Sequence, residues 1–169
     1  LGSRPSMGKT LFLTQLALHV SKSEPVMYVT FERTPFPFVN RFYSCLSGIE
    51  LNRLRTERMM SGELKGMEAI NEELYARKLF VTEKFKKPFV DFMAICHKAK
   101  QEHGIRLLII DGLQALEKYS APYEQDHLLW RLGEFALINK LCVIVSSQHT
   151  RDPEERGGSR RPELNDFQG

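Results

Sequence analysis

Residues 1–10 read LGSRPSMGKT, and an apolar helical pattern begins directly after them. The segment Gly8-Lys9-Thr10 is the closing half of a phosphate-binding loop, in which small residues allow backbone N–H groups to point at phosphate oxygens. The N-terminus of the helix that follows such a loop favours an anion. Lys9 would reach the outer phosphates, and the Thr10 hydroxyl would hold a magnesium ion. The stretch therefore predicts a site for a nucleotide and Mg²⁺.

One position departs from the usual pattern of this loop. Ser3 stands where the first glycine is expected, and Gly2 precedes it by one residue. A bare Gly-Lys-Thr also occurs in ordinary loops, so the tripeptide alone leaves a binding loop and a plain loop about equally open. In the binding interpretation the nucleotide is contacted by Ser3, Arg4, Pro5, Ser6, Met7, Gly8, Lys9 and Thr10.

The composition is that of an ordinary globular chain with room for one domain, residues 1–169. Hydrophobic residues make up 42% and charged residues 27%, and the net charge of +3 permits a nucleic-acid partner without arguing for one. The apolar runs are too short to span a bilayer, and no signal-peptide pattern is present. Cys45, Cys96 and Cys142 lack His or Cys neighbours at metal-ligand spacing and are interpreted as reduced thiols. We therefore expect a cytoplasmic protein without a membrane segment.

Strand-like and helix-like segments alternate along the chain, which predicts an α/β fold with a mostly parallel sheet flanked by helices. Only Leu1 precedes the phosphate loop, which a buried strand normally feeds, and the C-terminus is equally abrupt, so we expect a fragment truncated at both ends. Continuous β-prone runs predict strands at Val26–Phe31, Leu79–Thr82, Leu107–Asp111 and Leu141–Gln148. Helical patterns predict helices at Lys9–Ser21, Pro35–Ser47, Leu51–Met60, Glu63–Lys78, Pro88–His103 and Glu124–Asn139.

Glu32, Asp111 and Gln148 each stand at the carboxyl end of a predicted strand, where open α/β sheets bind their ligands. A carboxylate at Glu32 could orient or deprotonate water that attacks a γ-phosphate, and Asp111 could hold Mg²⁺ through water opposite Thr10. Gln148 could sense the γ-phosphate. Each residue alone is also consistent with a polar cap on a strand, and for Glu32 and Gln148 the local sequence favours that plain interpretation.

The C-terminal segment differs in character, since residues 151–161 combine Gly, Ser and Pro with several arginines. Arg151, Arg160 and Arg161, in a loop near a nucleotide site, suit binding to the backbone of single-stranded nucleic acid. A plain solvated loop explains the same residues equally well.

Taken together, the motifs resemble the C-terminal RecA-like ATPase domain of the DnaB-type replicative DNA helicases. Residues 4–10, RPSMGKT, resemble that family's phosphate loop, in which a small residue often replaces the first glycine. Thr30-Phe31-Glu32 resembles the strand end that carries the family's catalytic glutamate. Residues 109–114, IIDGLQ, resemble its Walker B segment, and residues 147–151, SQHTR, its Ser-Gln motif. Residues 166–169, DFQG, resemble the beginning of its DNA-contacting loop.

The resemblance implies a P-loop motor domain from a ring-shaped, usually hexameric, helicase that moves 5′→3′ on single-stranded DNA and unwinds duplex DNA in replication. It implies ATP and Mg²⁺ as ligands, with Lys9 on the β- and γ-phosphates and with Thr10 and Asp111 at the metal. It implies that Glu32 positions or deprotonates the attacking water and that Gln148 reports the γ-phosphate state to the DNA loop. A primase or a helicase loader would be a further partner.

Two departures from the family pattern and several alternatives stay open. Gln168 stands where the family usually has a basic residue, and we expect the segment that supplies an arginine finger to a neighbouring subunit to lie beyond Gly169. We therefore expect this chain alone to bind nucleotide but to hydrolyse it slowly. The alternatives are another RecA-like ATPase such as a recombinase, which residues 4–7 disfavour, and a nucleotide-binding paralogue without unwinding activity. A kinase would need a substrate pocket and lid arginines that the sequence does not reveal.

Overall fold

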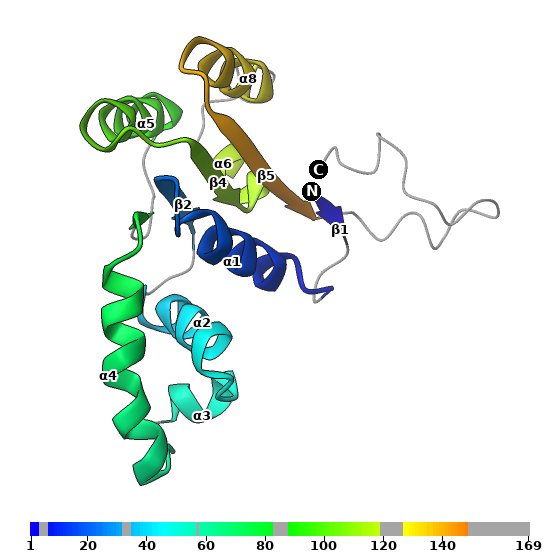
Figure 1. The fold of residues 1–169 in the computed structure, drawn as a ribbon. Helices are drawn as coiled ribbons and strands as arrows, with labels where there is room; N and C mark the ends of the chain where they lie inside the picture. Colours follow the sequence, from blue (N-terminus) through cyan, green and yellow to red (C-terminus); the bar gives the residue numbers. More distant parts are fainter. Residues whose placement is uncertain (4–6, 32–34, 57, 83–87, 119–126, 149–169) are drawn as a thin grey trace, which may run out of the picture.

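A computed structural model of the chain describes residues 1–3, 7–31, 35–56, 58–82, 88–118 and 127–148 (Figure 1). Within these ranges one sheet of five strands forms in the order β1-β5-β4-β2-β3, and all of its pairings are parallel. The predicted α/β fold with a parallel sheet is therefore confirmed. The strands are β1 Gly2–Ser3, β2 Val26–Thr30, β3 Leu79–Thr82, β4 Leu107–Asp111 and β5 Cys142–Gln148.

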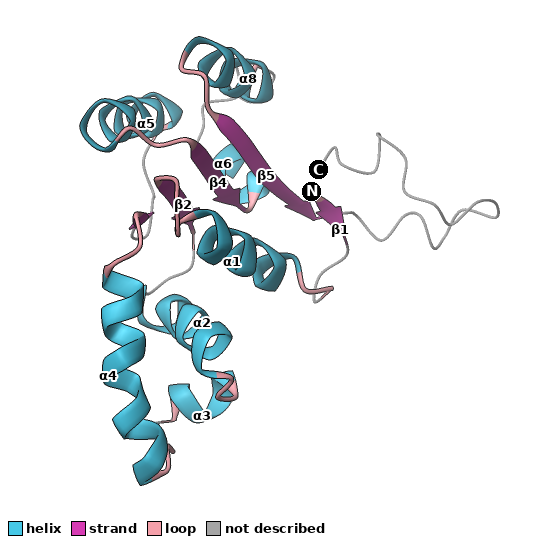
Figure 2. Cartoon of the chain, viewed as in Figure 1, coloured by secondary structure: helices cyan, strands magenta, loops and turns pink. Residues whose placement is uncertain are grey.

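Helices cover the sheet on both faces, as Figure 2 shows. One layer is formed by α5, α6 and α8, and the other by α1 and α2, with α3 and α4 packed beside α2. The helices are α1 Lys9–Val20, α2 Pro35–Ser47, α3 Leu51–Arg55, α4 Ser61–Tyr75, α5 Phe89–His103, α6 Leu113–Lys118 and α8 Leu128–Ile138.

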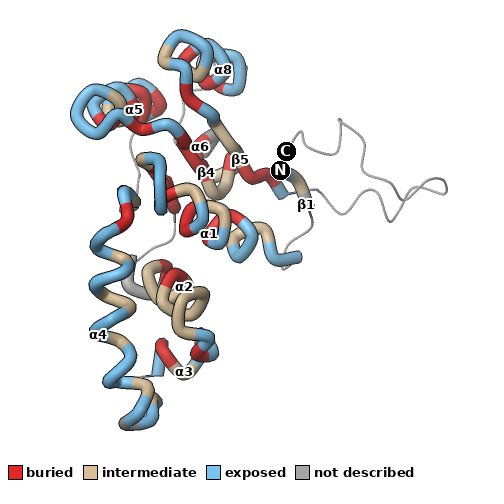
Figure 3. The backbone as a smooth tube through the Cα atoms, in the orientation of Figure 1, coloured by how far each residue is buried: buried red, intermediate tan, exposed pale blue. Residues whose placement is uncertain are grey.

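The side chains of the central strands alternate between these two helical layers, as the period of a strand requires. Val29 and Ile110 pack with α5, α6 and α8, whereas Tyr28 and Ile109 pack with α1 and α2. All residues of β2 and the first four of β4 are buried (Figure 3). A parallel strand buried on both faces is apolar at consecutive positions, which is why these two segments appear in the sequence as unbroken hydrophobic runs.

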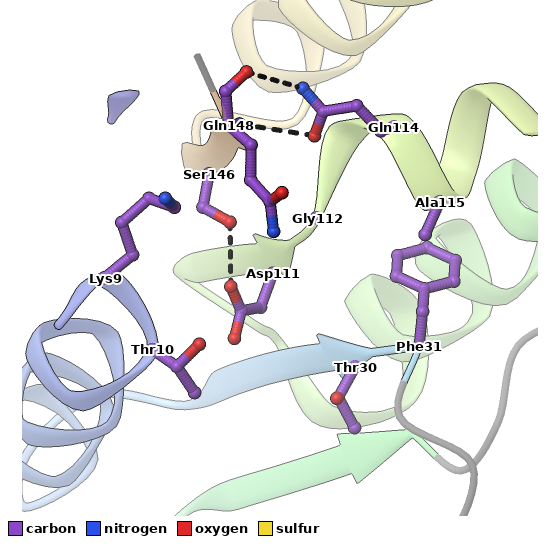
Figure 4. Close-up of a pocket in the computed structure, with 10 residues that line it drawn as sticks. All are labelled: Lys9, Thr10, Thr30, Phe31, Asp111, Gly112, Gln114, Ala115, Ser146 and Gln148. Carbon is purple, nitrogen blue, oxygen red and sulfur yellow. Dashed lines mark hydrogen bonds between the residues drawn. The ribbon is translucent and has the colours of Figure 1, made fainter. Parts of the chain in front are cut away.

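The strand register determines which side chains meet at the carboxyl edge of the sheet. Thr30 on β2 pairs with Asp111 on β4, and Asp111 pairs with Ser146 on β5. Since all strands run in the same direction, their carboxyl ends share one edge, and the N-terminus of α1 lies at that same edge (Figure 4). The fold therefore brings the phosphate-loop helix to the polar ends of β2, β4 and β5.

A short strand of two residues stands at the start of the phosphate loop, where the sequence showed only Leu1 ahead of the loop. Gly2 pairs with Ser147 and Ser3 pairs with Gln148, so β1 forms an edge of the described sheet. The Ser147 N–H also donates to the Leu1 carbonyl at 2.9 Å. Two residues are too few to show strand periodicity in a sequence, and it is pairing with β5 that makes them a strand.

Two helix boundaries near the middle of the chain differ from the prediction. α3 ends at Arg55 rather than at Met60, and Thr56 closes it. α4 begins at Ser61 rather than at Glu63, because the Glu63 carboxylate accepts a hydrogen bond from the Met60 N–H at 2.7 Å and satisfies a donor ahead of the first turn.

α4 ends at Tyr75 rather than at Lys78, because the chain turns there around a buried arginine. Arg77 donates from Nη1 to the Leu18 carbonyl and from Nη2 to the Glu73 carboxylate. The contact with Leu18 places a positive charge at the C-terminal turn of α1, where the helix dipole favours a cation. Arg77 therefore ties the end of α1 to the turn that leads into β3.

Some predicted features lie outside the described residues. The start of the helix predicted at Glu124 falls there, and α8 is described from Leu128 to Ile138. The arginine-rich segment 151–161 also falls there. Among the helices that the structure does describe, none is both long enough and apolar enough to cross a membrane.

Candidate nucleotide site

The phosphate loop is described at its closing end, where it enters α1. Gly8 has a φ of +83°, in the left-handed region that favours glycine, and α1 begins with the next residue, Lys9. The Phe12 N–H donates to the Gly8 carbonyl at 2.9 Å, so the hydrogen-bond ladder of α1 starts at this glycine. The first N–H groups of a helix have no partner within the helix, and they are suited to binding an anion.

A cavity of about 330 Å³ opens in front of this helix end, at the carboxyl edge of the sheet. Its size is at the lower end of the range for small-molecule sites, roughly 300–1,000 Å³. Figure 4 shows that α1, β2, β4, α6 and β5 all contribute side chains to it. The lining residues are Lys9, Thr10, Thr30, Phe31, Asp111, Gly112, Gln114, Ala115, Ser146 and Gln148.

The carboxylate of Asp111 is held by hydroxyl groups from both neighbouring strands. The Tyr28 hydroxyl of β2 donates to Oδ2 at 3.0 Å, and the Ser146 hydroxyl of β5 donates to Oδ1 at 2.7 Å. Each carboxylate oxygen thus has one hydroxyl donor and retains capacity to accept further hydrogen bonds. The carboxylate is fixed at the cavity wall opposite Lys9 and Thr10.

Burial and the charge of Asp111 act on two ionisable groups near the cavity. The pKa of the Tyr28 phenol is raised, first by burial and then by the negative charge and the hydrogen bond of Asp111. The pKa of Lys9 is lowered by desolvation, and the charge of Asp111 partly opposes that effect. An anion bound beside Lys9 would favour its charged form in the same way as Asp111 does.

Gln148, the last residue of β5, lines the cavity from the β5 side. Its side-chain amide reaches toward Gly112 and Asp111, while its backbone faces Gln114 of α6 (Figure 4). The Gln114 amide nitrogen donates to the Gln148 carbonyl at 3.1 Å and to the Ser147 hydroxyl at 2.8 Å. The Gln114 amide oxygen accepts from the Gln148 N–H at 3.3 Å.

The structure brings together several of the residues that the sequence singled out. Lys9, Thr10, Asp111 and Gln148 line one cavity, although they are far apart in the chain. Gly8 stands directly before Lys9, and the backbone of Ser3 lies in β1. The predicted residues that lie outside the described part of the chain are Arg4, Pro5, Ser6, Glu32, Arg151, Arg160, Arg161 and Gln168.

Tyr28 and Ser146 were not predicted as site residues from the sequence, and Gln114 was assigned to the Walker B segment without a role of its own. Tyr28 and Ser146 belong to buried runs, and only the strand order brings their hydroxyls to Asp111. Gln114 belongs to α6, a helix of six residues that is too short to show a helical period. The signal for Gln114 in the sequence was its place in the Walker B segment, residues 109–114, three residues after Asp111.

A family model described as "DnaB-like helicase C terminal domain" matches residues 1–169, the whole chain. The chain belongs to this family. One relative, the "Probable plasmid replicative DNA helicase" of Chlamydia psittaci, is 26% identical over 173 residues, which cover 99% of this chain. The "Replicative DNA helicase DnaB" of Geobacillus stearothermophilus is 25% identical over 174 residues, again covering 99% of this chain. The chain spans 38% of the length of each of these relatives.

Solved structures share the fold. One whose title describes it as an "ATPase Domain" matches with a TM-score of 0.84 and 23% identity, covering 99% of this chain and 62% of that one. A structure of a DnaB-like replicative helicase, whose title names interactions with primase, matches with a TM-score of 0.82 and 23% identity, covering 99% of this chain and 42% of that one. The prediction of a RecA-like fold of the DnaB type is therefore confirmed.

Proposed function

We propose that this chain is the ATP-hydrolysing motor domain of a replicative DNA helicase and that it couples hydrolysis to movement along single-stranded DNA. One observation carries the proposal: Lys9, Thr10, Asp111 and Gln148 line a single cavity at the N-terminus of α1. Membership of the DnaB-like family supports the same conclusion, because curated relatives are named as replicative DNA helicases.

ATP would bind with its phosphates at the N-terminus of α1. The N–H groups of a helix start and the helix dipole favour the negative charge there, and the Lys9 ammonium would neutralise the β- and γ-phosphates. The residues present also fit Mg²⁺, which prefers oxygen ligands, since a hydroxyl from Thr10 and the Asp111 carboxylate face the same cavity. When bound, Mg²⁺ supplies charge neutralisation on the phosphates.

Hydrolysis would then follow from the residues around the γ-phosphate. In the proposed step the oxygen of a water molecule attacks the γ-phosphorus, the bond from phosphorus to the β-phosphate oxygen breaks, and ADP and phosphate leave. Glu32 would orient this water and take its proton; it follows β2 by two residues in the sequence. Gln148 would donate a hydrogen bond to the γ-phosphate and so distinguish ATP from ADP.

The partners of this motor are part of the same proposal. Arg151, Arg160, Arg161 and Gln168 follow Gln148 in the sequence and would contact the DNA backbone, with the arginines supplying the charge. A homohexameric ring would be the working assembly, and a primase or a helicase loader would be its partner. The solved DnaB-like helicase whose title names primase interactions supports the choice of primase.

Magnesium-dependent binding of a fluorescent ATP analogue to the chain and to Lys9→Ala tests the nucleotide site. We expect a loss of roughly 10- to 100-fold in affinity, because a hydrogen bond to a charged group contributes about 1.5–3 kcal/mol. The matched control is Lys98→Ala, an exposed lysine on α5 that pairs with Glu102 at 3.8 Å. Equal binding by the parent chain and Lys9→Ala would contradict the proposed site.

A second measurement separates a motor from a passive nucleotide-binding paralogue. In a motor, Glu32→Gln should abolish ATP hydrolysis while ATP binding is retained, because the amide cannot accept the proton from water. Hydrolysis by the parent that Glu32→Gln leaves unchanged would assign Glu32 no catalytic role. Binding without hydrolysis, in the ring-forming protein with DNA present, would favour the passive paralogue.

A further inference from the structure

Gln114 makes a two-sided contact with the end of β5. Its amide oxygen accepts from the Gln148 N–H at 3.3 Å, and its amide nitrogen donates to the Gln148 carbonyl at 3.1 Å. The same nitrogen donates to the Ser147 hydroxyl at 2.8 Å. A primary amide carries one acceptor and a pair of donors, and here it pairs with both backbone groups of one residue as a neighbouring strand would.

The strand order explains why β5 needs such a partner at this point. The ladder between β4 and β5 ends with the pair Asp111 and Ser146, so β4 does not extend alongside Gln148. The Ser147 N–H points the other way, to the Leu1 carbonyl at 2.9 Å. The Gln148 N–H therefore faces the side of β5 on which β4 has already ended. The Gln114 side chain lies there and accepts the hydrogen bond that a longer β4 would have accepted.

This contact fixes the backbone of Gln148 and leaves its side chain in the cavity. Figure 4 shows the Gln114 amide against the backbone of Gln148, while the Gln148 amide extends toward Asp111 and Gly112. Gln114 itself follows Asp111 by three residues, across Gly112, whose φ of +116° turns the chain. One short segment thus carries both the acidic residue of the cavity and the support for Gln148.

We propose that Gln114 is the positioning residue that holds Gln148 against the terminal phosphate of a nucleoside triphosphate. Discrimination between triphosphate and diphosphate then depends on Gln114, although Gln114 reaches the phosphate only through Gln148. This inference rests on the proposed function, because it takes the cavity to be a nucleotide site.

The test is a double-mutant cycle on nucleotide affinity, which does not require turnover. Gln114→Met, Gln148→Met and the double variant are compared with the parent for binding of a non-hydrolysable ATP analogue and of ADP. We expect each single change to lower the preference for the triphosphate by about tenfold and to leave ADP affinity within about twofold. The double variant should lose no more than either single variant, because the two residues act as one unit.

Matched variants keep the result interpretable. Gln101→Met makes the same substitution at an exposed position of α5 and should leave both affinities unchanged. Gln114→Glu keeps the length and the acceptor for the Gln148 N–H but places a carboxylate oxygen against the Gln148 carbonyl, so it should lower the preference for the triphosphate at least as much as Gln114→Met. ADP binding reports in every variant whether the fold and the phosphate loop are intact.

Two outcomes would overturn the inference while the proposed function stands. One is an equal loss of ATP-analogue and ADP affinity in Gln114→Met, which is the result of a purely structural role. The other is additivity in the double variant, which would make Gln114 and Gln148 independent. Failure of both the parent and Gln101→Met to bind either nucleotide would instead refute the proposed function, and the inference with it.

Discussion

Replacing Tyr28 with phenylalanine removes one oxygen atom from the core and leaves the aromatic packing in place. The Tyr28 side chain is fully buried, and its ring lies 4.8 Å from the Phe38 ring and 6.0 Å from the Phe42 ring, measured between centroids. Tyr28→Phe keeps these contacts and deletes the hydrogen bond to Asp111 Oδ2 at 3.0 Å. The variant therefore isolates the contribution of the hydroxyl that holds the carboxylate.

The magnitude follows from the charge of the acceptor. A hydrogen bond to a charged group contributes about 1.5–3 kcal/mol, so the free energy of unfolding should fall by about that amount at neutral pH. The pKa of Tyr28 is raised above its ordinary value near 10 by burial and by Asp111. Above about pH 10 the unfolded chain loses the phenol proton and the folded chain keeps it, so the parent loses about 1.4 kcal/mol of stability per pH unit.

Tyr28→Phe lacks this proton, so the stability difference between parent and variant should be constant below about pH 10 and shrink above it. Urea denaturation followed by far-ultraviolet circular dichroism, between about pH 7 and pH 11, measures both effects. Tyr75→Phe is the matched control, because the Tyr75 side chain is 87% exposed. Equal stability of parent and variant at neutral pH, or a constant difference through pH 11, would refute the reasoning.

Two further predictions concern the framework around the site, and urea denaturation measures both. Arg77→Met should lower the free energy of unfolding by about 1–3 kcal/mol, because it removes the charged donor to the Leu18 carbonyl and leaves the Ser21 hydroxyl at 3.3 Å to donate there. The exposed control Lys98→Met should change it by less than about 0.5 kcal/mol, and equal effects would contradict the role of Arg77. Gly112→Ala should lower the free energy of unfolding by about 1–3 kcal/mol, since a side chain at a φ of +116° is strained. The control Gly66→Ala, on an open face of α4, should raise it by about 0.5–1 kcal/mol. An unchanged stability in Gly112→Ala would refute the strain argument.

The sheet and the phosphate-loop helix were predictable because their signals are local. Leu107–Asp111 is an unbroken apolar run that ends in a carboxylate, and a strand buried on both faces produces that pattern whatever its neighbours are. The apolar run after Thr10 likewise predicts a helix that starts at the loop. For the same reason Lys9, Thr10 and Asp111 could be assigned to one edge of the sheet before the strand order was known.

The supporting contacts of the site could not be predicted, because they depend on which strands are neighbours. The sequence predicts Tyr28 only as a buried strand residue. Its hydroxyl can donate to Asp111 only because β4 lies beside β2. Gln114 acquires its role only because β5 extends beyond the end of β4. The end of α4 at Tyr75 could not be predicted for the same reason, because it depends on the contact of Arg77 with Leu18 of α1.

The register that aligns Thr30, Asp111 and Ser146 also has a consequence for folding. Since side chains alternate across a strand, a slip of one residue between β2 and β4 would turn Asp111 away from α1 and the Tyr28 hydroxyl. A slip between β4 and β5 would turn the Ser146 hydroxyl away from Asp111. A misregistered chain thus has no complete cavity, and a ligand of this site would stabilise only the correctly paired sheet. At a ligand concentration about 100 times the Kd, that selective stabilisation is about 2.7 kcal/mol. A ligand present during refolding would thereby raise the yield of chains with the correct strand register.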